Sequence, residues 1–145
     1  MTGVQPCALP IWFNNTLAFL KELAPARTHI FTFSRREGTP AADMDENVDQ
    51  SSVRARYSEL SAAALEASYQ YRRAFLGRQL DVLVETKRDK ATGCLKGYSD
   101  NYIKVHFEGP DEIMKRIVPV MVTEVDENRT GGDRKSTRLN SSHRL

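Results

Sequence analysis

The hydrophobic pattern changes at Gly77, and this change limits the possible folds more than any other feature. Before Gly77, apolar side chains recur at helical spacing, as on one face of an amphipathic helix. After Gly77, apolar side chains alternate with other residues over short runs, as in half-buried strands. The fold class predicted from this pattern is α+β, with a mainly helical part followed by an all-β part.

The first helix is predicted over 13–24, where apolar residues fall on one stripe. Asn14 or Asn15 is a candidate N-cap, and Pro25 ends the helix. A strand follows at 28–33, which is rich in β-branched and aromatic residues. A helix, a short loop and a strand form one αβ step of a parallel sheet or barrel. One step cannot bury its own apolar faces, so we expect it to end a larger domain.

A loop over 34–43 comes next, as its Gly and Pro content indicates. Sites in parallel α/β barrels lie at the C-terminal ends of the strands, where this loop begins. A long helix is predicted from Asp49 to Phe75. Its apolar stripe consists of Val53, Tyr57, Leu60, Ala64, Ala67, Tyr71 and Phe75. Gly77 is a natural stop for this helix.

Four short strands are predicted beyond Gly77. They lie at 79–86, 95–99, 103–107 and 117–125, with turns at 91–93 and 100–101. Strands of this length joined by short turns indicate a small antiparallel barrel.

Both ends of the chain resemble translated sequencing-adapter sequence. Residues 133–145 resemble a common short-read adapter read in one frame, and residues 1–12 resemble its reverse complement. The alternative for the head is a secretory signal, but the head has no basic segment and no long apolar run. We therefore expect neither end to be native, and both are excluded from the fold prediction.

This exclusion changes the meaning of the net charge. The whole chain has 21 basic and 19 acidic residues, and the tail at 133–145 contributes four basic and one acidic residue. The remainder, with 17 and 18, is close to neutral, so a basic nucleic-acid arm is not inferred. No apolar run approaches the roughly 20 residues of a membrane span. The two cysteines, Cys7 and Cys94, form no disulfide framework, zinc motif or iron–sulfur motif.

The loop and the segments after it resemble the methylthiotransferases of the radical-SAM superfamily. The family pattern is an aromatic residue, Ser, any residue, Arg, any residue and Gly-Thr. It is filled by Phe33, Ser34, Arg36, Gly38 and Thr39. The barrel that begins at 77–85 resembles the TRAM domain that ends these enzymes. Within the family, 97–105 is most similar to the branch that acts on threonylcarbamoyladenosine in tRNA.

The resemblance implies a domain plan. Residues 13–45 are expected to be the terminal αβ step of a radical-SAM partial TIM-type barrel, 46–76 a linking helix, and 77–132 a TRAM domain. A TRAM barrel has a last strand after 117–125, and we expect that strand to be lost here. An open barrel exposes unpaired backbone groups, so we expect marginal stability and aggregation.

The resemblance also implies an activity, the addition of a methylthio group to C2 of threonylcarbamoyladenosine beside the tRNA anticodon. The expected partner is the tRNA anticodon stem-loop in the cytoplasm, with neither membrane nor DNA involved. The family uses S-adenosylmethionine and two four-iron, four-sulfur clusters. Such clusters need cysteine thiolates that this chain lacks, so we expect it to hold no cofactor, to contain no catalytic or metal-binding residue and to be inactive alone. Alternatives are a stand-alone TRAM-type RNA-binding module and the isopentenyladenosine-specific sister enzyme.

Four loop residues are candidate contacts at the barrel edge: Ser34, Arg36, Gly38 and Thr39. Arg36 is suited to bind a carboxylate or phosphate bidentately, or to form an ion pair within the loop. Gly38 and Thr39 are typical of a turn, and Ser34 is typical of a backbone cap.

Five barrel residues are candidate RNA contacts: Lys96, Tyr98, Asn101, Tyr102 and Lys104. Small barrels bind single-stranded RNA by stacking bases on aromatic rings and pairing phosphates with basic groups. The alternative is that the tyrosines divide between core and surface and the lysines are merely solvated. Residues 77–132 hold nine basic and ten acidic groups, which argues against strong nonspecific binding. His29, His106 and Cys94 are interpreted as structural residues.

Overall fold

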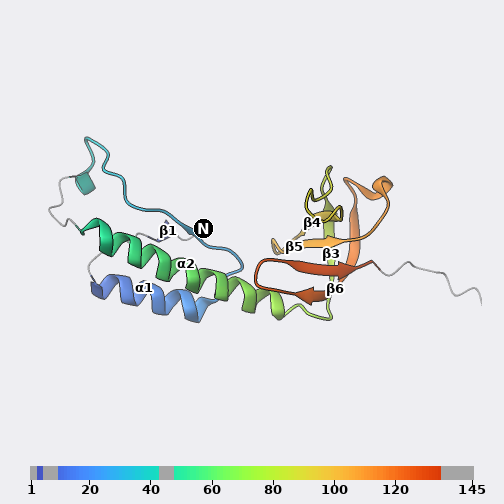
Figure 1. Cartoon of the computed structure of the whole chain (residues 1–145), viewed down its shortest axis with the longest axis horizontal. Helices are drawn as coiled ribbons and strands as arrows, with labels where there is room; N and C mark the ends of the chain where they lie inside the picture. The colour runs from blue at the N-terminus through green and yellow to red at the C-terminus, as the bar shows by residue number, and fades with distance from the viewer. Residues whose placement is uncertain (1–2, 5–9, 43–47, 135–145) are drawn as a thin grey trace, which may run out of the picture. The chain divides into compact units, whose positions relative to one another are not determined.

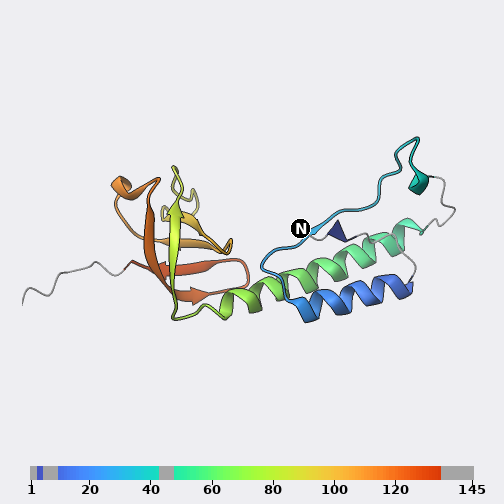
Figure 2. The same ribbon diagram turned by 180° about the vertical axis from the view of Figure 1, so that it is seen from behind.

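The computed structural model describes residues 3–4, 10–42 and 48–134 (Figures 1 and 2). The chain divides into two compact units, 1–74 and 75–145.

The first unit contains two helices and one pair of very short strands. Helix α1 spans Pro10–Leu23, and α2 spans Gln50–Arg73 beside it in both views (Figures 1 and 2). Strand β1 (Gly3–Val4) pairs in parallel with β2 (His29–Ile30). The core forms between the helices, from Phe13, Leu17, Leu20 and Leu60, with Ile30, Ala63 and Ala64 packed against it. The spacing of the α1 residues therefore produces the buried face that the sequence predicts.

Two details of this unit differ from the prediction. Asn14 and Asn15 lie inside α1 and do not cap it, because the helix begins at Pro10. Proline suits the first turn, since its fixed φ is already helical and its missing N–H is not needed there. The predicted strand at 28–33 is reduced to His29–Ile30. Among the described residues, its parallel neighbour β1 pairs with it at two positions only, Gly3 with His29 and Val4 with Ile30.

Helix α2 begins where the sequence predicts. Asp49 is the N-cap, and its carboxylate accepts hydrogen bonds from the Ser52 amide (3.0 Å), the Ser52 hydroxyl (2.6 Å) and the Ser51 hydroxyl. The bonds from the Ser51 and then the Ser52 side chain hold the pKa of Asp49 far below its usual value. On the predicted stripe, Val53, Leu60 and Ala67 are buried, whereas Tyr57 is 43% exposed.

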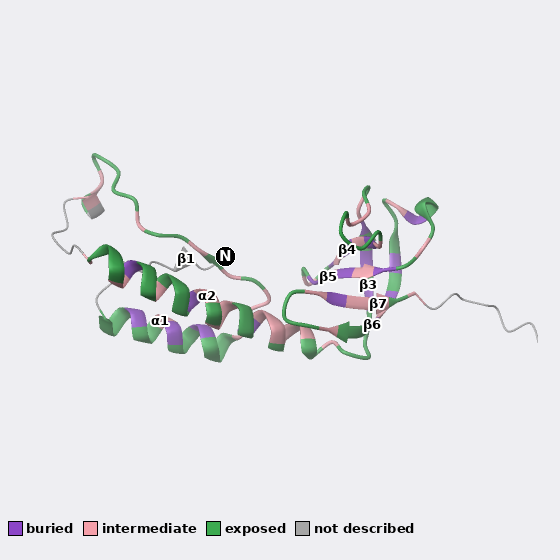
Figure 3. Cartoon of the chain, viewed as in Figure 1, coloured by how far each residue is buried: buried purple, intermediate pink, exposed green. Residues whose placement is uncertain are grey.

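The second unit is a small closed β-barrel with strand order β3-β4-β5-β7-β6, in agreement with the predicted TRAM-like architecture. Its strands are β3 (Gln79–Val84), β4 (Leu95–Ser99), β5 (Lys104–Phe107), β6 (Ile117–Val125) and β7 (Thr130–Asp133). Alternate residues face inward. Buried positions alternate with exposed ones along β3, with intermediate ones along β4 and β5, and with exposed or intermediate ones over the first part of β6 (Figure 3). Leu80, Val82 and Val84 of β3 are among the buried core residues.

The prediction that the last strand is lost was wrong. Strand β7 follows β6 and pairs with it antiparallel, while its other edge pairs in parallel with β5 and closes the barrel. In the sequence Thr-Gly-Gly-Asp only Thr130 favours a strand, whereas glycine and aspartate are depleted in strands, so propensity alone did not reveal it. Because the barrel is closed, the expected aggregation through an open barrel edge no longer has a structural basis.

Candidate nucleic-acid interface

An outward-facing row of side chains crosses the strands of the barrel. Leu83 on β3 lies opposite Tyr98 on β4, which lies opposite Lys104 on β5. On the other side of Leu83, Ile117 of β6 continues the row. Leu83 is 53% exposed and Ile117 is 68% exposed. The ammonium of Lys104 lies 5.6 Å from the centroid of the Tyr98 ring, a cation–π contact that fixes the two side chains together.

A second row carries charge. Lys96 of β4 lies opposite His106 of β5, and the Lys96 Nζ is 3.6 Å from the Glu85 Oε2. Ion pairs of partly exposed residues contribute little stability, typically under about 1 kcal/mol. An anionic ligand can therefore replace Glu85 as the partner of Lys96 at small cost.

A groove of about 500 Å³ is lined by residues of both rows. Leu83 and Tyr98 provide its apolar surface. Three lysines line it, against one carboxylate, that of Glu85: Lys87, Lys96 and Lys115. A groove with an aliphatic and an aromatic surface and an excess of cations is suited to a polyanion that also carries flat apolar groups.

Arg88, next to Lys87, is engaged in holding the barrel loops. Its guanidinium donates to the Asp111 carboxylate (2.9 Å) and to the carbonyls of Gly93 (2.9 Å) and Gly109 (2.8 Å). These bonds tie the β3–β4 loop to the segment before β6. Arg88 is therefore a structural residue of this face.

The turn between β4 and β5 contains two of the predicted contacts. Its backbone is closed by bonds from the Tyr102 amide to the Ser99 carbonyl and from the Ser99 amide to the Ile103 carbonyl, both 3.0 Å. Asn101 accepts a hydrogen bond from the Ser99 hydroxyl, so its amide oxygen is used within the turn. Tyr102 has φ +63° and is 77% exposed. The turn thus exposes the aromatic ring of Tyr102 to solvent, although the backbone conformation at this position favours glycine.

A polar cluster adjoins Lys96 on the barrel surface. The His106 Nε2 is 3.8 Å from the Asp89 Oδ1, and its Nδ1 is buried with no hydrogen-bond partner among the described residues. Burial, followed by the charge of Arg129, lowers the pKa of His106, and the nearby Asp89 only partly offsets this. The pKa of Asp89 is lowered chiefly by the Thr92 amide, which donates to its carboxylate. The arrangement favours a neutral imidazole.

The loop candidates lie in the first unit, in the segment after β2. Thr39 donates to the Arg36 carbonyl through both its hydroxyl (2.8 Å) and its amide (3.3 Å), and Gly38 has φ +79°. Ser34, Arg36 and Gly38 are exposed, whereas Thr39 is half-buried. Residues 36–39 therefore form a turn, and 43–45 of the predicted barrel-edge segment fall outside the described residues.

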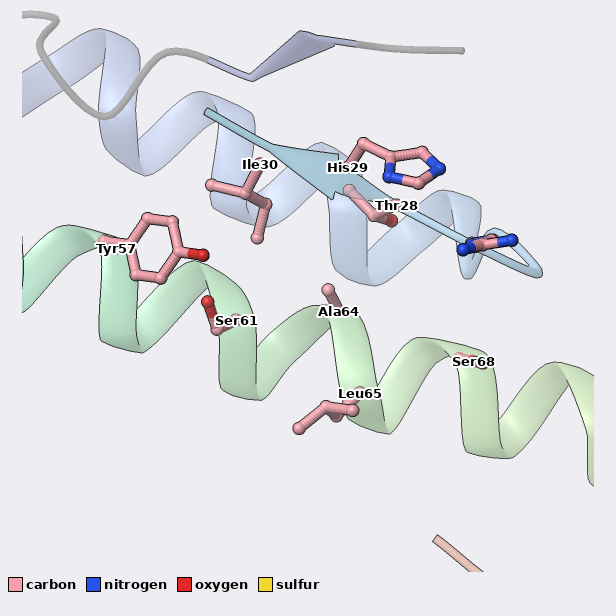
Figure 4. Close-up of a pocket in the computed structure, with 9 residues that line it drawn as sticks. Thr28, His29, Ile30, Tyr57, Ser61, Ala64, Leu65 and Ser68 are labelled. Atoms are coloured by element: carbon pink, nitrogen blue, oxygen red, sulfur yellow. The ribbon is translucent and has the colours of Figure 1, made fainter. Parts of the chain in front are cut away.

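A second groove, of about 440 Å³, lies in the first unit between β2 and α2 (Figure 4). Thr28 and Ile30 face the helix, and Tyr57, Ser61 and Ala64 rise from α2 opposite them (Figure 4). The Thr28 hydroxyl is buried and has no hydrogen-bond partner among the described residues. This groove contains none of the predicted site residues.

The five predicted RNA contacts thus lie in or beside the groove on this face of the barrel. Lys96 and Tyr98 line the groove, Lys104 contacts Tyr98, and Asn101 and Tyr102 lie in the adjoining turn. Sequence reasoning missed Leu83, Lys87 and Lys115. The alternation of β3 is a signal for Leu83, because inward-facing Val82 and Val84 place it outward. Lys87 and Lys115 come from loops, where no periodic signal exists.

The residues present do not fit the cofactors that the resemblance implies. An iron–sulfur cluster needs several cysteine thiolates, and the whole chain has two cysteines, Cys7 and Cys94. Across the described ranges, no group of three or more His, Cys, Asp or Glu side chains is arranged to hold a metal ion. Among the same residues, no helix is both long and apolar enough to cross a bilayer.

No family model matches the chain. Individual relatives do match. The chain is 32% identical over 112 residues to the threonylcarbamoyladenosine tRNA methylthiotransferase MtaB of Bacillus subtilis, covering 76% of this chain and 25% of the relative. The protein of that name from Thermotoga maritima is 37% identical over 97 residues, covering 67% of this chain and 22% of the relative.

A differently named enzyme matches equally well. The tRNA-2-methylthio-N(6)-dimethylallyladenosine synthase of Streptomyces griseus is 35% identical over 116 residues, covering 77% of this chain and 23% of the relative. The chain spans about a quarter of the length of the curated relatives it matches. Over about three quarters of its own length, this chain is therefore a homologue of part of the tRNA methylthiotransferases.

Proposed function

We propose that this chain is the C-terminal part of a tRNA methylthiotransferase and that its barrel binds the tRNA substrate. The groove supports tRNA binding by the barrel, because it combines three lysines with the apolar surface of Leu83 and Tyr98. The lysines are Lys87, Lys96 and Lys115. Homology to tRNA-modifying enzymes supports RNA as the polyanion. The same role makes the cytoplasm, where tRNA is modified, the proposed location.

The proposed substrate of the intact enzyme is threonylcarbamoyladenosine beside the anticodon, which would receive a methylthio group at C2. The support is the resemblance of 97–105 to that branch. Relatives named for the dimethylallyladenosine reaction match at similar identity, so that reaction is the second candidate. The test is to express the intact gene in a host lacking both activities and to analyse its tRNA nucleosides by mass spectrometry. Methylthiolation of dimethylallyladenosine instead would overturn the choice of branch.

The chemistry of the intact enzyme is proposed to reside outside this chain. S-adenosylmethionine and the two four-iron, four-sulfur clusters would be held by preceding domains, and the chain alone would be inactive. We also propose that 1–12 and 133–145 are adapter-derived. Sequencing the source locus across both junctions tests these points together. An in-frame CxxxCxxC upstream supports them, and a gene with the boundaries of this chain would favour a small RNA-binding protein.

RNA binding is tested on the 145-residue chain itself. Fluorescence anisotropy with a labelled tRNA anticodon stem-loop measures affinity for the wild type and for the double variant Lys96→Gln, Lys104→Gln. We expect the double variant to bind more weakly and with a shallower salt dependence, since two phosphate contacts are removed. Lys90→Gln removes a charge from a lysine that neither lines the groove nor contacts Tyr98, and it is the control for the loss of a single charge. No binding by the wild type would refute the role of the barrel.

A further inference from the structure

The most informative residue of the groove is Lys115, whose backbone has φ +62°. L-residues other than asparagine and aspartate rarely adopt this left-handed conformation, which costs them about 1–2 kcal/mol, whereas achiral glycine adopts it freely. In the same unit, Gly77, Gly93 and Tyr102 also have positive φ, and Tyr102 is itself a candidate RNA contact. A long cationic side chain at such a position therefore needs an explanation beyond the turn itself.

The surrounding hydrogen bonds fix the position of Lys115. Its amide donates to the Val84 carbonyl (3.0 Å), and the Val84 amide donates to the Arg116 carbonyl (2.9 Å). This pair of bonds attaches the segment before β6 to the end of β3. Because the backbone is held on both sides, the Lys115 side chain begins at a fixed point on the groove wall.

We propose that the groove lined by β3, β4 and Lys115 binds the phosphates of an unpaired RNA strand and that Lys115 is a phosphate-binding residue of this site. This inference rests on the proposed function and names the part of the RNA that the barrel recognises. Lys87 and Lys96 supply the neighbouring cations, so three lysines and one glutamate line the groove. Charge complementarity therefore favours a polyanion.

The apolar surface distinguishes an unpaired strand from a duplex. Leu83 is 53% exposed beside the Tyr98 ring, within the same groove as the lysines. Bases of a duplex are stacked on one another, so only its sugars and phosphates would meet this surface. An unpaired strand presents free base and ribose faces that can contact Leu83 and Tyr98 while its phosphates reach the lysines.

The test uses the 145-residue chain and a short labelled oligouridylate, with anisotropy measured over a series of salt concentrations. Three variants are compared with the wild type. Lys115→Asn removes the charge but tolerates the left-handed backbone, Lys115→Arg keeps the charge, and Lys90→Asn removes a charge outside the groove. Each phosphate contact to a single strand contributes about 0.7 to the salt slope, which corresponds to about fivefold in affinity at about 0.1 M salt.

We expect Lys115→Asn to bind about fivefold more weakly with a slope reduced by about 0.7, and its thermal unfolding midpoint to be no lower than that of the wild type. Lys115→Arg and Lys90→Asn should bind within about twofold of the wild type. If the wild type binds but Lys115→Asn binds equally well, the groove assignment is wrong and the proposed function stands. Failure of the wild type to bind any RNA refutes the proposed function itself.

Competition with two other polyanions, an RNA duplex and an acidic peptide, tests whether the groove prefers unpaired RNA. An RNA duplex of the same length should compete more weakly than the unpaired strand, because it offers no free base to Leu83. Equal competition would overturn the preference for unpaired RNA. An acidic peptide should not displace the oligouridylate at comparable charge, and displacement by it would show a general polyanion surface instead.

Discussion

A Cβ added at Gly132 would lie 2.5 Å from the Cγ1 of Val120. The same atom would lie 2.9 Å from the Met121 carbonyl oxygen and 3.0 Å from the Cγ1 of Val105. Two of these neighbours belong to β6 and one to β5, the strands between which β7 inserts. The missing side chain at Gly132 therefore allows β7 to close the barrel.

Gly132→Ala should destabilise the barrel by about 1–3 kcal/mol, the usual cost of forcing extra atoms into a packed interior. Hydrogen exchange of the β6 amides, measured over a series of urea concentrations, gives the decrease in the free energy of unfolding. Gly131→Ala is the matched control, because its nearest contact would be at 3.4 Å, an ordinary van der Waals distance. Equal destabilisation by both variants would show that packing at Gly132 does not control closure.

Leu60→Ala should destabilise the first unit by about 2–5 kcal/mol, because it leaves a cavity between α1 and α2. Leu60 is fully buried among Phe13, Leu17 and Leu20. The chain has one tryptophan, Trp12 of α1, and its fluorescence during urea unfolding reports on this unit. Leu65→Ala removes the same side chain from a site that is 58% exposed and should have a small effect. A similarly small effect of Leu60→Ala would contradict the helix pairing.

The parts of the fold that were predictable have strong local patterns. The inward alternation of Leu80, Val82 and Val84 predicted β3, and the helical stripe with Asp49 at its start predicted α2. Strand β7 was not predictable in this way, since its Gly132 is selected by contact with β5 and β6 rather than by strand propensity. Contacts with strands that are distant in the sequence cannot be read from a short segment alone.

The candidate site shows the same division. The interleaving of aromatic and basic residues on neighbouring strands indicated Lys96 and Tyr98, and these two residues do line the groove. Lys115 is distant in sequence and reaches the groove only through its bonds with Val84. Strand register and loop closure, which a single sequence does not display, bring these residues together.

The stability of the barrel should fall on mild acidification because of His106. Its pKa in the folded barrel lies below the ordinary value of 6.5, owing to burial, then Arg129 and Lys104, with Asp89 opposing. As the pH falls through about 6.5, the unfolded chain gains a proton that the folded barrel resists, so the free energy of unfolding decreases until the folded pKa is passed. The lowered pKa of Asp89 also stabilises the barrel, and this stabilisation is lost only as the pH falls below the ordinary pKa of 3.8.

His106→Gln should therefore flatten the dependence of barrel stability on pH between about 7.5 and about 5.5. Urea midpoints at several pH values measure this dependence. His29→Gln removes an exposed imidazole from the first unit and should leave the response of the barrel unchanged. A His106→Gln variant that retains the wild-type pH dependence would assign the effect to other groups.

Tyr102→Gly should raise stability and lower RNA affinity together. Glycine adopts φ +63° without a Cβ penalty, so we expect the barrel to gain about 0.5–1 kcal/mol. The lost ring is 77% exposed, and stacking of one base on such a ring is worth about 1–3 kcal/mol, so affinity for oligouridylate should fall at least about fivefold. Tyr102→Phe keeps the ring and should bind like the wild type. Unchanged binding by Tyr102→Gly, measured beside its thermal midpoint, would make Tyr102 a turn residue with no part in RNA recognition.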